Sequence, residues 1–96
     1  MKLRFSRLSR NDLVSIGGWI AKDNPERAVE YVFEIETTCQ RLIDFPFTGE
    51  KIGRYQKEEI RRKVQGSHVV LYTVRAEMIF VVRVILGAQD YLRFLD

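Results

Sequence analysis

The chain has 96 residues, 46% of them hydrophobic, and a formal net charge of +3. This length predicts one small domain over residues 1–96, with enough apolar side chains to build a core. The modest positive charge permits an acidic partner, but it lacks the concentration of basic residues typical of a dedicated nucleic-acid binder. One cysteine and one histidine provide no ligand set for zinc, so we expect neither a metal nor another cofactor.

No segment of the sequence predicts targeting to a membrane. The N-terminal stretch MKLRFSRLSR lacks the apolar run of a signal peptide, and nothing approaches the roughly 18 apolar residues of a membrane span. We therefore expect a cytoplasmic protein that does not associate with a membrane. The single cysteine, Cys39, occupies an apolar helical position and is predicted to be a small buried side chain, not a nucleophile.

The first predicted elements are a short strand and a helix. Residues 2–6 alternate weakly between polar and apolar side chains, which favours a strand. Ser9 and Asp12 have the spacing of a capping box, and apolar residues then recur at helical intervals, so we expect a helix over 9–22. Gly17 and Gly18 lie inside this helix, where each costs about 1 kcal/mol relative to alanine. Close packing of a second helix is the favoured explanation, and contact with a partner protein is the alternative.

A second helix is predicted over 25–44. Asn24 can cap it, Pro25 suits its first position, and apolar residues from Ala28 to Leu42 step by three and four. The short connection predicts an antiparallel helical hairpin. Residues 46–59 contain two glycines, one proline and mixed charges, which favours a loop.

The C-terminal half predicts three strands over 60–65, 68–74 and 78–86, separated by short turns. Short turns favour an antiparallel meander. The whole order is therefore β-α-α-β-β-β, an α+β fold with the helical hairpin on one face of the sheet. Asp12, Glu34, Glu36 and Glu50 are interpreted as solvated carboxylates, and His68 as a solvated or capping side chain.

Arginine and lysine are the most prominent side chains that could carry out chemistry. They lie on or beside the predicted sheet, at Arg61, Arg62, Lys63, Arg83 and Arg93. Cations of this kind can hold a scissile phosphate in metal-free RNA cleavage, but the reaction also needs an acid and a base. Solvated or ion-paired arginines are the competing interpretation. Arg83 interrupts the apolar run from Met78 to Leu86, so we predict a carboxylate or carbonyl within hydrogen-bond reach of its guanidinium.

Four segments together resemble the ParE/RelE toxin superfamily of bacterial type II toxin-antitoxin systems. They read NDLVSIGGWIAKDNPERAVEYV (11–32), CQRLIDFPFTG (39–49), GSHVVLYTV (66–74) and VVRVILGAQD (81–90). The resemblance spans nearly the whole chain and agrees with the β-α-α-β-β-β order. It rests on the order and spacing of the segments, since no single motif is decisive.

The superfamily divides by function, and the sequence is more similar to the ParE-like branch. RelE-like mRNA interferases typically carry an arginine at the start of the third strand of the whole fold, which corresponds to 68–74 here. They carry another arginine after the last strand. Here Val69 and Gln89 stand in those regions, although Tyr91 is present in the tail. Two segments fit the ParE-like pattern, through Ser67, His68, Val69 and Tyr72 and through Arg83, Val84, Gly87 and Asp90. Leu86 departs from it, because that branch often has histidine at this position.

The resemblance implies a toxin that acts by binding, without covalent chemistry of its own, and that has no catalytic residues. It would inhibit DNA gyrase, trap gyrase-DNA cleavage complexes and block replication, as in plasmid stabilisation. A ParD-like antitoxin would neutralise it with a segment that folds on binding, and operator DNA would be bound only through that complex. The alternatives are a RelE-like ribosome-dependent mRNA interferase and a non-toxic member that serves as an interaction module.

Two sets of residues are the predicted binding sites. The set for the target comprises Arg61, Arg62, Lys63, Arg83, Gln89, Tyr91, Arg93 and Phe94. The set for the antitoxin, on the helical hairpin, comprises Leu13, Ile16, Gly17, Trp19 and Ile20. The apolar tail residues Tyr91, Leu92, Phe94 and Leu95 are predicted either to cover the sheet or to form a partner surface.

Overall fold

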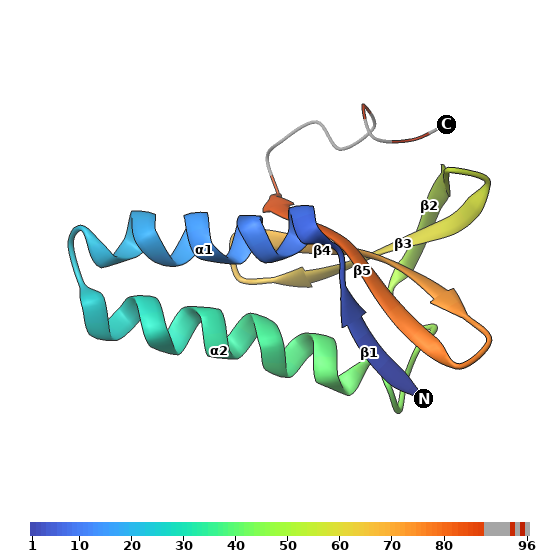
Figure 1. Cartoon of the computed structure of the whole chain (residues 1–96), viewed down its shortest axis with the longest axis horizontal. Coiled ribbons are helices and arrows are strands. Elements are labelled where there is room, and N and C mark those ends of the chain that lie inside the picture. Colours follow the sequence, from blue (N-terminus) through green and yellow to red (C-terminus); the bar gives the residue numbers. More distant parts are fainter. Residues whose placement is uncertain (88–92, 94, 96) are drawn as a thin grey trace.

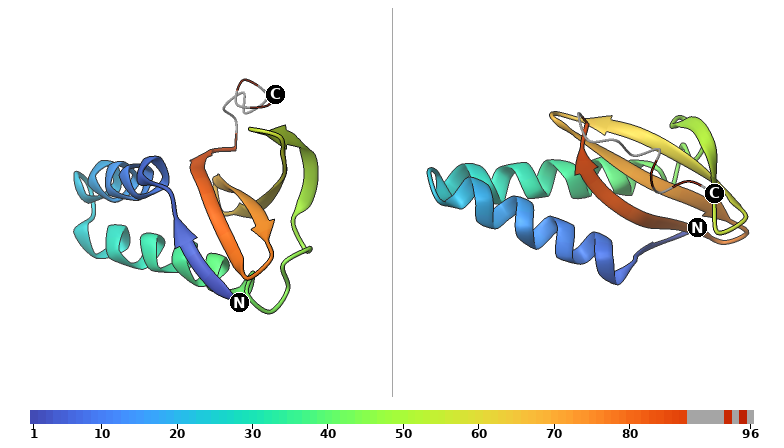
Figure 2. Two further views of the ribbon diagram at one scale, coloured as in Figure 1. Left: turned by 45° about the vertical axis from the view of Figure 1, so that its right-hand side comes forward. Right: turned by 90° about the horizontal axis from the view of Figure 1, so that it is seen from above.

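A computed structural model describes residues 1–87, 93 and 95. Its elements are β1 (Lys2–Phe5), α1 (Arg7–Ala21), α2 (Pro25–Arg41), β2 (Glu50–Tyr55), β3 (Glu58–Gln65), β4 (His68–Arg75) and β5 (Met78–Leu86). The five strands form one sheet in the order β1-β5-β4-β3-β2. The two helices pack side by side on one face of this sheet (Figures 1 and 2). The predicted α+β class, with a helical hairpin between the first strand and the rest of the sheet, is therefore confirmed.

The sheet contains one more strand than the sequence predicted. The antiparallel meander of β3, β4 and β5 is confirmed, whereas β1 joins β5 in parallel and makes the sheet mixed. The loop predicted over 46–59 is wrong, because β2 forms an antiparallel hairpin with β3. The hairpin turns at Gln56 and Lys57, which adopt positive φ angles of 50° and 69°. Neither residue is the glycine or asparagine that normally marks such a turn, so the sequence carries no signal for it.

The first helix begins two residues earlier than predicted, at Arg7. Ser6 is its N-cap, and the Ser6 hydroxyl accepts a hydrogen bond of 3.0 Å from the Ser9 amide. The capping box predicted from Ser9 to Asp12 is therefore wrong. Ser9 is buried in the first turn, and the carboxylate of Asp12 points to β5.

The second helix begins as predicted, with Asn24 accepting from the Arg27 amide and Pro25 in the first turn. It ends at Arg41, three residues before the predicted boundary. At Gly17 a β-carbon would lie 3.3 Å from the Val32 Cγ2 atom, which confirms the close helix packing predicted there. At Gly18 a β-carbon would have no neighbour within 4 Å, and nothing in the structure explains that glycine.

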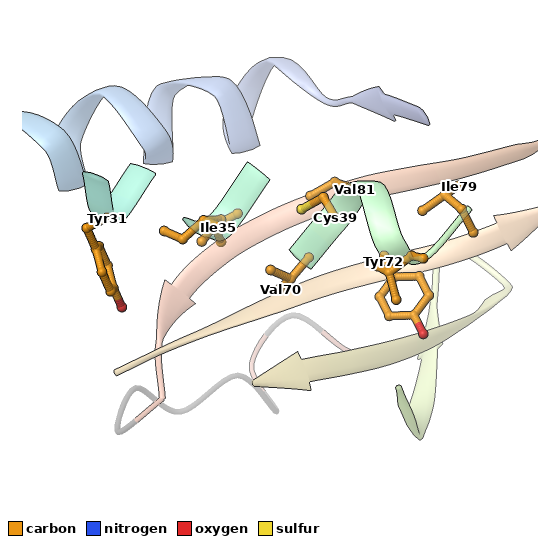
Figure 3. Packing of buried hydrophobic residues seen from close by; sticks show 9 residues of the cluster. Tyr31, Ile35, Cys39, Val70, Tyr72, Ile79 and Val81 are labelled. Carbon is orange, nitrogen blue, oxygen red and sulfur yellow. The ribbon is translucent and has the colours of Figure 1, made fainter. Parts of the chain in front are cut away.

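Two apolar clusters lie on opposite faces of the sheet. The larger one, between the helices and the sheet, includes Ile35, Cys39 and Tyr72 (Figure 3). Cys39 is fully buried, as predicted, and burial raises the pKa of its thiol to about 12. The smaller cluster, on the other face, is built around Ile60 and Leu71. Leu95 packs against this second cluster, so this tail residue covers the sheet.

Candidate functional site

The candidate site lies where α1 replaces β1 beside the edge of β5. The strand β1 pairs only with the first residues of β5, from Met78 to Val81. Beyond that point Ser6 continues the contact, because its amide donates to the Val81 carbonyl at 2.9 Å and its hydroxyl donates to the Val82 carbonyl at 2.6 Å. The rest of the β5 edge therefore faces a helix, which cannot supply a regular ladder of backbone hydrogen bonds.

Asp12 joins α1 to this edge through three hydrogen bonds. Its carboxylate accepts from Arg83 Nε at 2.8 Å, from Arg83 Nη2 at 2.9 Å and from the Val84 amide at 2.9 Å. The side chains are only 15% exposed for Asp12 and 22% exposed for Arg83. Hydrogen bonding to Asp12 raises the pKa of the Arg83 guanidinium. The predicted carboxylate partner of Arg83 is confirmed, whereas the interpretation of Asp12 as a solvated carboxylate is wrong.

Among the described residues, none forms a hydrogen bond with this edge of β5 beyond the Val84 amide. The Gly87 amide donates to the Ser67 carbonyl at 2.8 Å, so the residues at 85 and 87 direct their backbone groups toward β4. By the two-residue alternation of a strand, Val84 and Leu86 direct theirs to the opposite side, where Asp12 takes the Val84 amide. The backbone of Leu86 therefore faces the space beside α1.

That space is a groove of about 620 Å³ between α1 and the end of β5. Its apolar lining comes from Ile16, Trp19 and Ile20 on α1 and from Ile85 and Leu86 on β5. Trp19 and Leu86 are 73% and 52% exposed, which is unusual for side chains of this size. A groove with apolar walls and an open strand edge has the features that bind a peptide segment, either as a helix or as an added strand.

A partly buried hydrogen-bond network contributes Tyr31, Ser67 and His68 to the lining of the groove. The Tyr31 hydroxyl lies 2.7 Å from His68 Nδ1 and 3.1 Å from both the Gln65 carbonyl and the Ser67 amide. All three bonds form together only if the hydroxyl donates to Gln65 and accepts from Ser67 and from a proton on His68 Nδ1. This tautomer leaves His68 Nε2 as an acceptor. Burial lowers the pKa of His68, which favours the neutral ring.

Only three of the five residues predicted to bind the antitoxin line the groove. Ile16, Trp19 and Ile20 line the groove, as that prediction requires. Leu13 packs against the larger core cluster, and Gly17 faces α2. These two residues support the groove from behind and do not line it.

The basic residues predicted for the target do not converge. Arg61 and Lys63 pair with β4 residues of the helix-covered core, whereas Arg62 pairs with Leu71 on the opposite face. Arg61 donates to the Gly49 carbonyl at 2.8 Å and stacks on Phe47, and Arg62 forms an ion pair with Glu50. Arg93 is exposed. The predictions for Gln89, Tyr91 and Phe94 lie outside the described residues.

Sequence reasoning missed two contributors to the site. Asp12 carried the local pattern of a helix cap, and its real partners are 71 and 72 positions away in the chain. Tyr31 belonged to the apolar stripe of the second helix, and nothing in the sequence distinguished its hydroxyl as the centre of a network. His68, interpreted as a solvated or capping side chain, is half-buried and lines the groove.

Two further properties concern the described residues alone. Among them, no group of three or more histidine, cysteine or carboxylate side chains is arranged to hold a metal ion. Neither of the two helices found there has the length and apolarity needed to cross a bilayer.

Comparisons with known proteins agree with this fold. A family model described as the ParE toxin of the type II toxin-antitoxin system parDE matches residues 3–91. No curated protein matches the chain in sequence. The chain is similar in structure to the chromosomal ParDE TA system from P. aeruginosa, with a TM-score of 0.71, 21% identity, and coverage of 90% of this chain and 95% of that one. It is also similar to the YoeB/ParE toxin from Agrobacterium tumefaciens, with a TM-score of 0.60, 17% identity, and coverage of 91% and 99%.

Proposed function

The chain belongs to the ParE toxin family of parDE type II toxin-antitoxin systems, and from that premise we propose that it inhibits DNA gyrase. The family match over residues 3–91 is the observation that carries this proposal. The toxin would act by binding in the cytoplasm, where it would trap gyrase on cleaved DNA and block replication. The two strand segments typical of the ParE-like branch, around His68 and Arg83, add support.

We also propose that a ParD-like antitoxin neutralises the toxin by occupying the groove between α1 and β5. The apolar lining favours an amphipathic helix of the antitoxin, with Trp19 as the central contact. The open backbone of Leu86 favours a strand of the same segment, added to the sheet edge. The antitoxin, not the toxin, would then select the operator sequence.

Purified gyrase provides the direct test of the target. We expect the chain, in micromolar excess, to block supercoiling and to increase the yield of cleaved DNA. Absence of both effects would refute gyrase as the target. Cleavage of translated mRNA at the ribosomal A site would then favour an mRNA interferase, and normal growth after induced expression would favour a non-toxic interaction module.

Replacement of Trp19 tests the groove separately. Trp19→Ala removes a large exposed side chain from the lining of the groove, and such a contact contributes about 2–4 kcal/mol at protein interfaces. We expect at least about 30-fold weaker binding of a cognate ParD-like antitoxin. Toxicity should persist and should no longer be neutralised.

Val14→Ala is the matched control, because Val14 is 75% exposed on the same helix but does not line the groove. It should leave antitoxin binding unchanged. Equal loss of binding in the two variants, or no loss in Trp19→Ala, would place the antitoxin elsewhere.

A further inference from the structure

The positive charge of the chain is concentrated at its N-terminus. Lys2, Arg4, Arg7 and Arg10 lie within the first ten residues, which contain no acidic residue. The chain has 16 Lys and Arg in total, so the charges of the remaining 12 are cancelled by the 13 Asp and Glu, which exceed them by one. The whole net charge of +3 therefore originates in this one segment, which we call the basic edge.

All four side chains of the basic edge are exposed. Lys2 and Arg4 alternate with the less exposed Leu3 and Phe5 along β1, the edge strand of the sheet. Arg7 and Arg10 are three residues apart on α1, on neighbouring turns of the helix. Within the described part of the chain, none of the four forms an ion pair, whereas Arg27, Arg62, Arg75 and Arg83 all do. The nearest acidic residue in sequence, Asp12, is already occupied by Arg83 and Val84.

Structural roles account for only part of this charge. Lys2 and Arg4 can protect an exposed strand edge from pairing with another chain. Arg7 and Arg10 lie in the first turns of α1, where the helix dipole disfavours cations, and the first turn contains no acidic residue to offset them. Arg7 and Arg10 therefore do not stabilise the helix, and edge protection does not explain them.

We propose that the basic edge binds the phosphate backbone of duplex DNA directly. DNA presents one negative charge per roughly 1.7 Å of its axis, so a segment with four exposed cations and no acidic residue of its own is complementary to it, although Glu77 lies beside Lys2, whose amide donates to the Glu77 carbonyl. The basic edge comprises β1 and the start of α1, whereas Trp19 and Ile20 of the groove lie close to the last residue of that helix, Ala21. A toxin whose groove is filled could thus still contact DNA through the basic edge. This contact adds DNA affinity without sequence selection, because no base is read.

The salt dependence of binding measures this contact. Four phosphate contacts predict that log K falls with log salt at a slope of about −3.6. Affinity for DNA should then drop about 150-fold between roughly 50 and 200 mM KCl. A fluorescent duplex of about 20 base pairs and mixed sequence, followed by anisotropy with the full chain alone, gives the slope.

A triple substitution, Arg4→Gln, Arg7→Gln and Arg10→Gln, should reduce the slope to about −0.9. The control triple, Lys22→Gln, Arg41→Gln and Lys57→Gln, removes the same charge from exposed positions elsewhere and should keep the slope near that of the parent. If the first triple does not fold, the single variants at Arg7 and Arg10 should each reduce the slope by about 1.

Three results would overturn the proposal: no DNA binding at about 50 mM salt, an equal loss of slope in both triples, or an unchanged slope in the first triple. An unchanged slope accompanied by aggregation would indicate protection of the strand edge only. The assay contains neither gyrase nor antitoxin, so its failure is independent of the proposed toxin function.

Discussion

The ion pair between Asp12 and Arg83 should be among the most costly contacts to remove. Asp12→Ala leaves a guanidinium that is only 22% exposed without its carboxylate, and it also removes the acceptor of the Val84 amide. Removing one partner of a buried pair costs about 3–5 kcal/mol, and the residual exposure of this pair favours the lower end. We therefore expect a loss of about 3 kcal/mol of unfolding free energy, or on the order of 12–24 °C in Tm.

A double-mutant cycle with Arg83→Met isolates the interaction itself. Methionine keeps much of the apolar stem of Arg83 but removes its charge and donors. We expect the double variant, measured by urea denaturation, to be at least about 1.5 kcal/mol more stable than the sum of the single losses predicts. Asp12→Asn should be intermediate, because its amide oxygen can still accept from Val84.

Additive losses, within about 0.5 kcal/mol, would refute the argument. So would a loss below about 1 kcal/mol for Asp12→Ala, because that value is typical of an exposed ion pair. Either result would mean that α1 is not joined to β5 by this contact and that the groove is not held at a fixed width.

Three further predictions concern stability. Gly18→Ala should raise the unfolding free energy by about 0.5–1 kcal/mol. Gly17→Ala should raise it by less, because the added methyl group would lie 3.3 Å from Val32 Cγ2. Thermal denaturation of the two variants provides the comparison. Gly49→Ala should cost more than about 3 kcal/mol by the same assay, since its β-carbon would lie 2.6 Å from the Tyr72 ring. The lowered pKa of His68 predicts stability that is fully present above about pH 6.5 and falls as the pH drops through that value, because the unfolded chain then binds more protons. Urea titrations at several pH values should show that His68→Gln lacks this component, and an identical pH profile would contradict it.

The sequence was sufficient for elements whose signals are local. The second helix has its cap at Asn24, its proline at the first position and a clean apolar stripe, and the structure starts it at the predicted residue. The strands β4 and β5 are rich in β-branched side chains and short turns separate them, so their positions were also predictable.

The missing information was tertiary. The strand β2 contains Gly53 with a φ of 148° and a register shift beside it, and these features resemble a loop until β3 is paired with it. The Ser9–Asp12 spacing matched a capping box, yet Arg83 on the adjacent strand β5 gives Asp12 a charged partner that binds it more strongly than a helix amide would. A local sequence pattern indicates only interactions between residues that are close together in the chain. It cannot reveal an ion pair formed by residues 71 positions apart.

The groove is a consequence of unequal strand lengths. The strand β5 has nine residues and β1 has four, so β1 can pair with less than half of its neighbour. Ser6 and Asp12 satisfy the next backbone groups of β5, up to the Val84 amide. Of the residues that the structure describes, Asp12 is therefore the last to bind this edge, and the backbone of Leu86 lies beyond its reach. A longer β1 would close the sheet edge and displace the start of α1, and both walls of the groove would be lost. The short first strand thus provides the open edge on which we propose that the antitoxin binds.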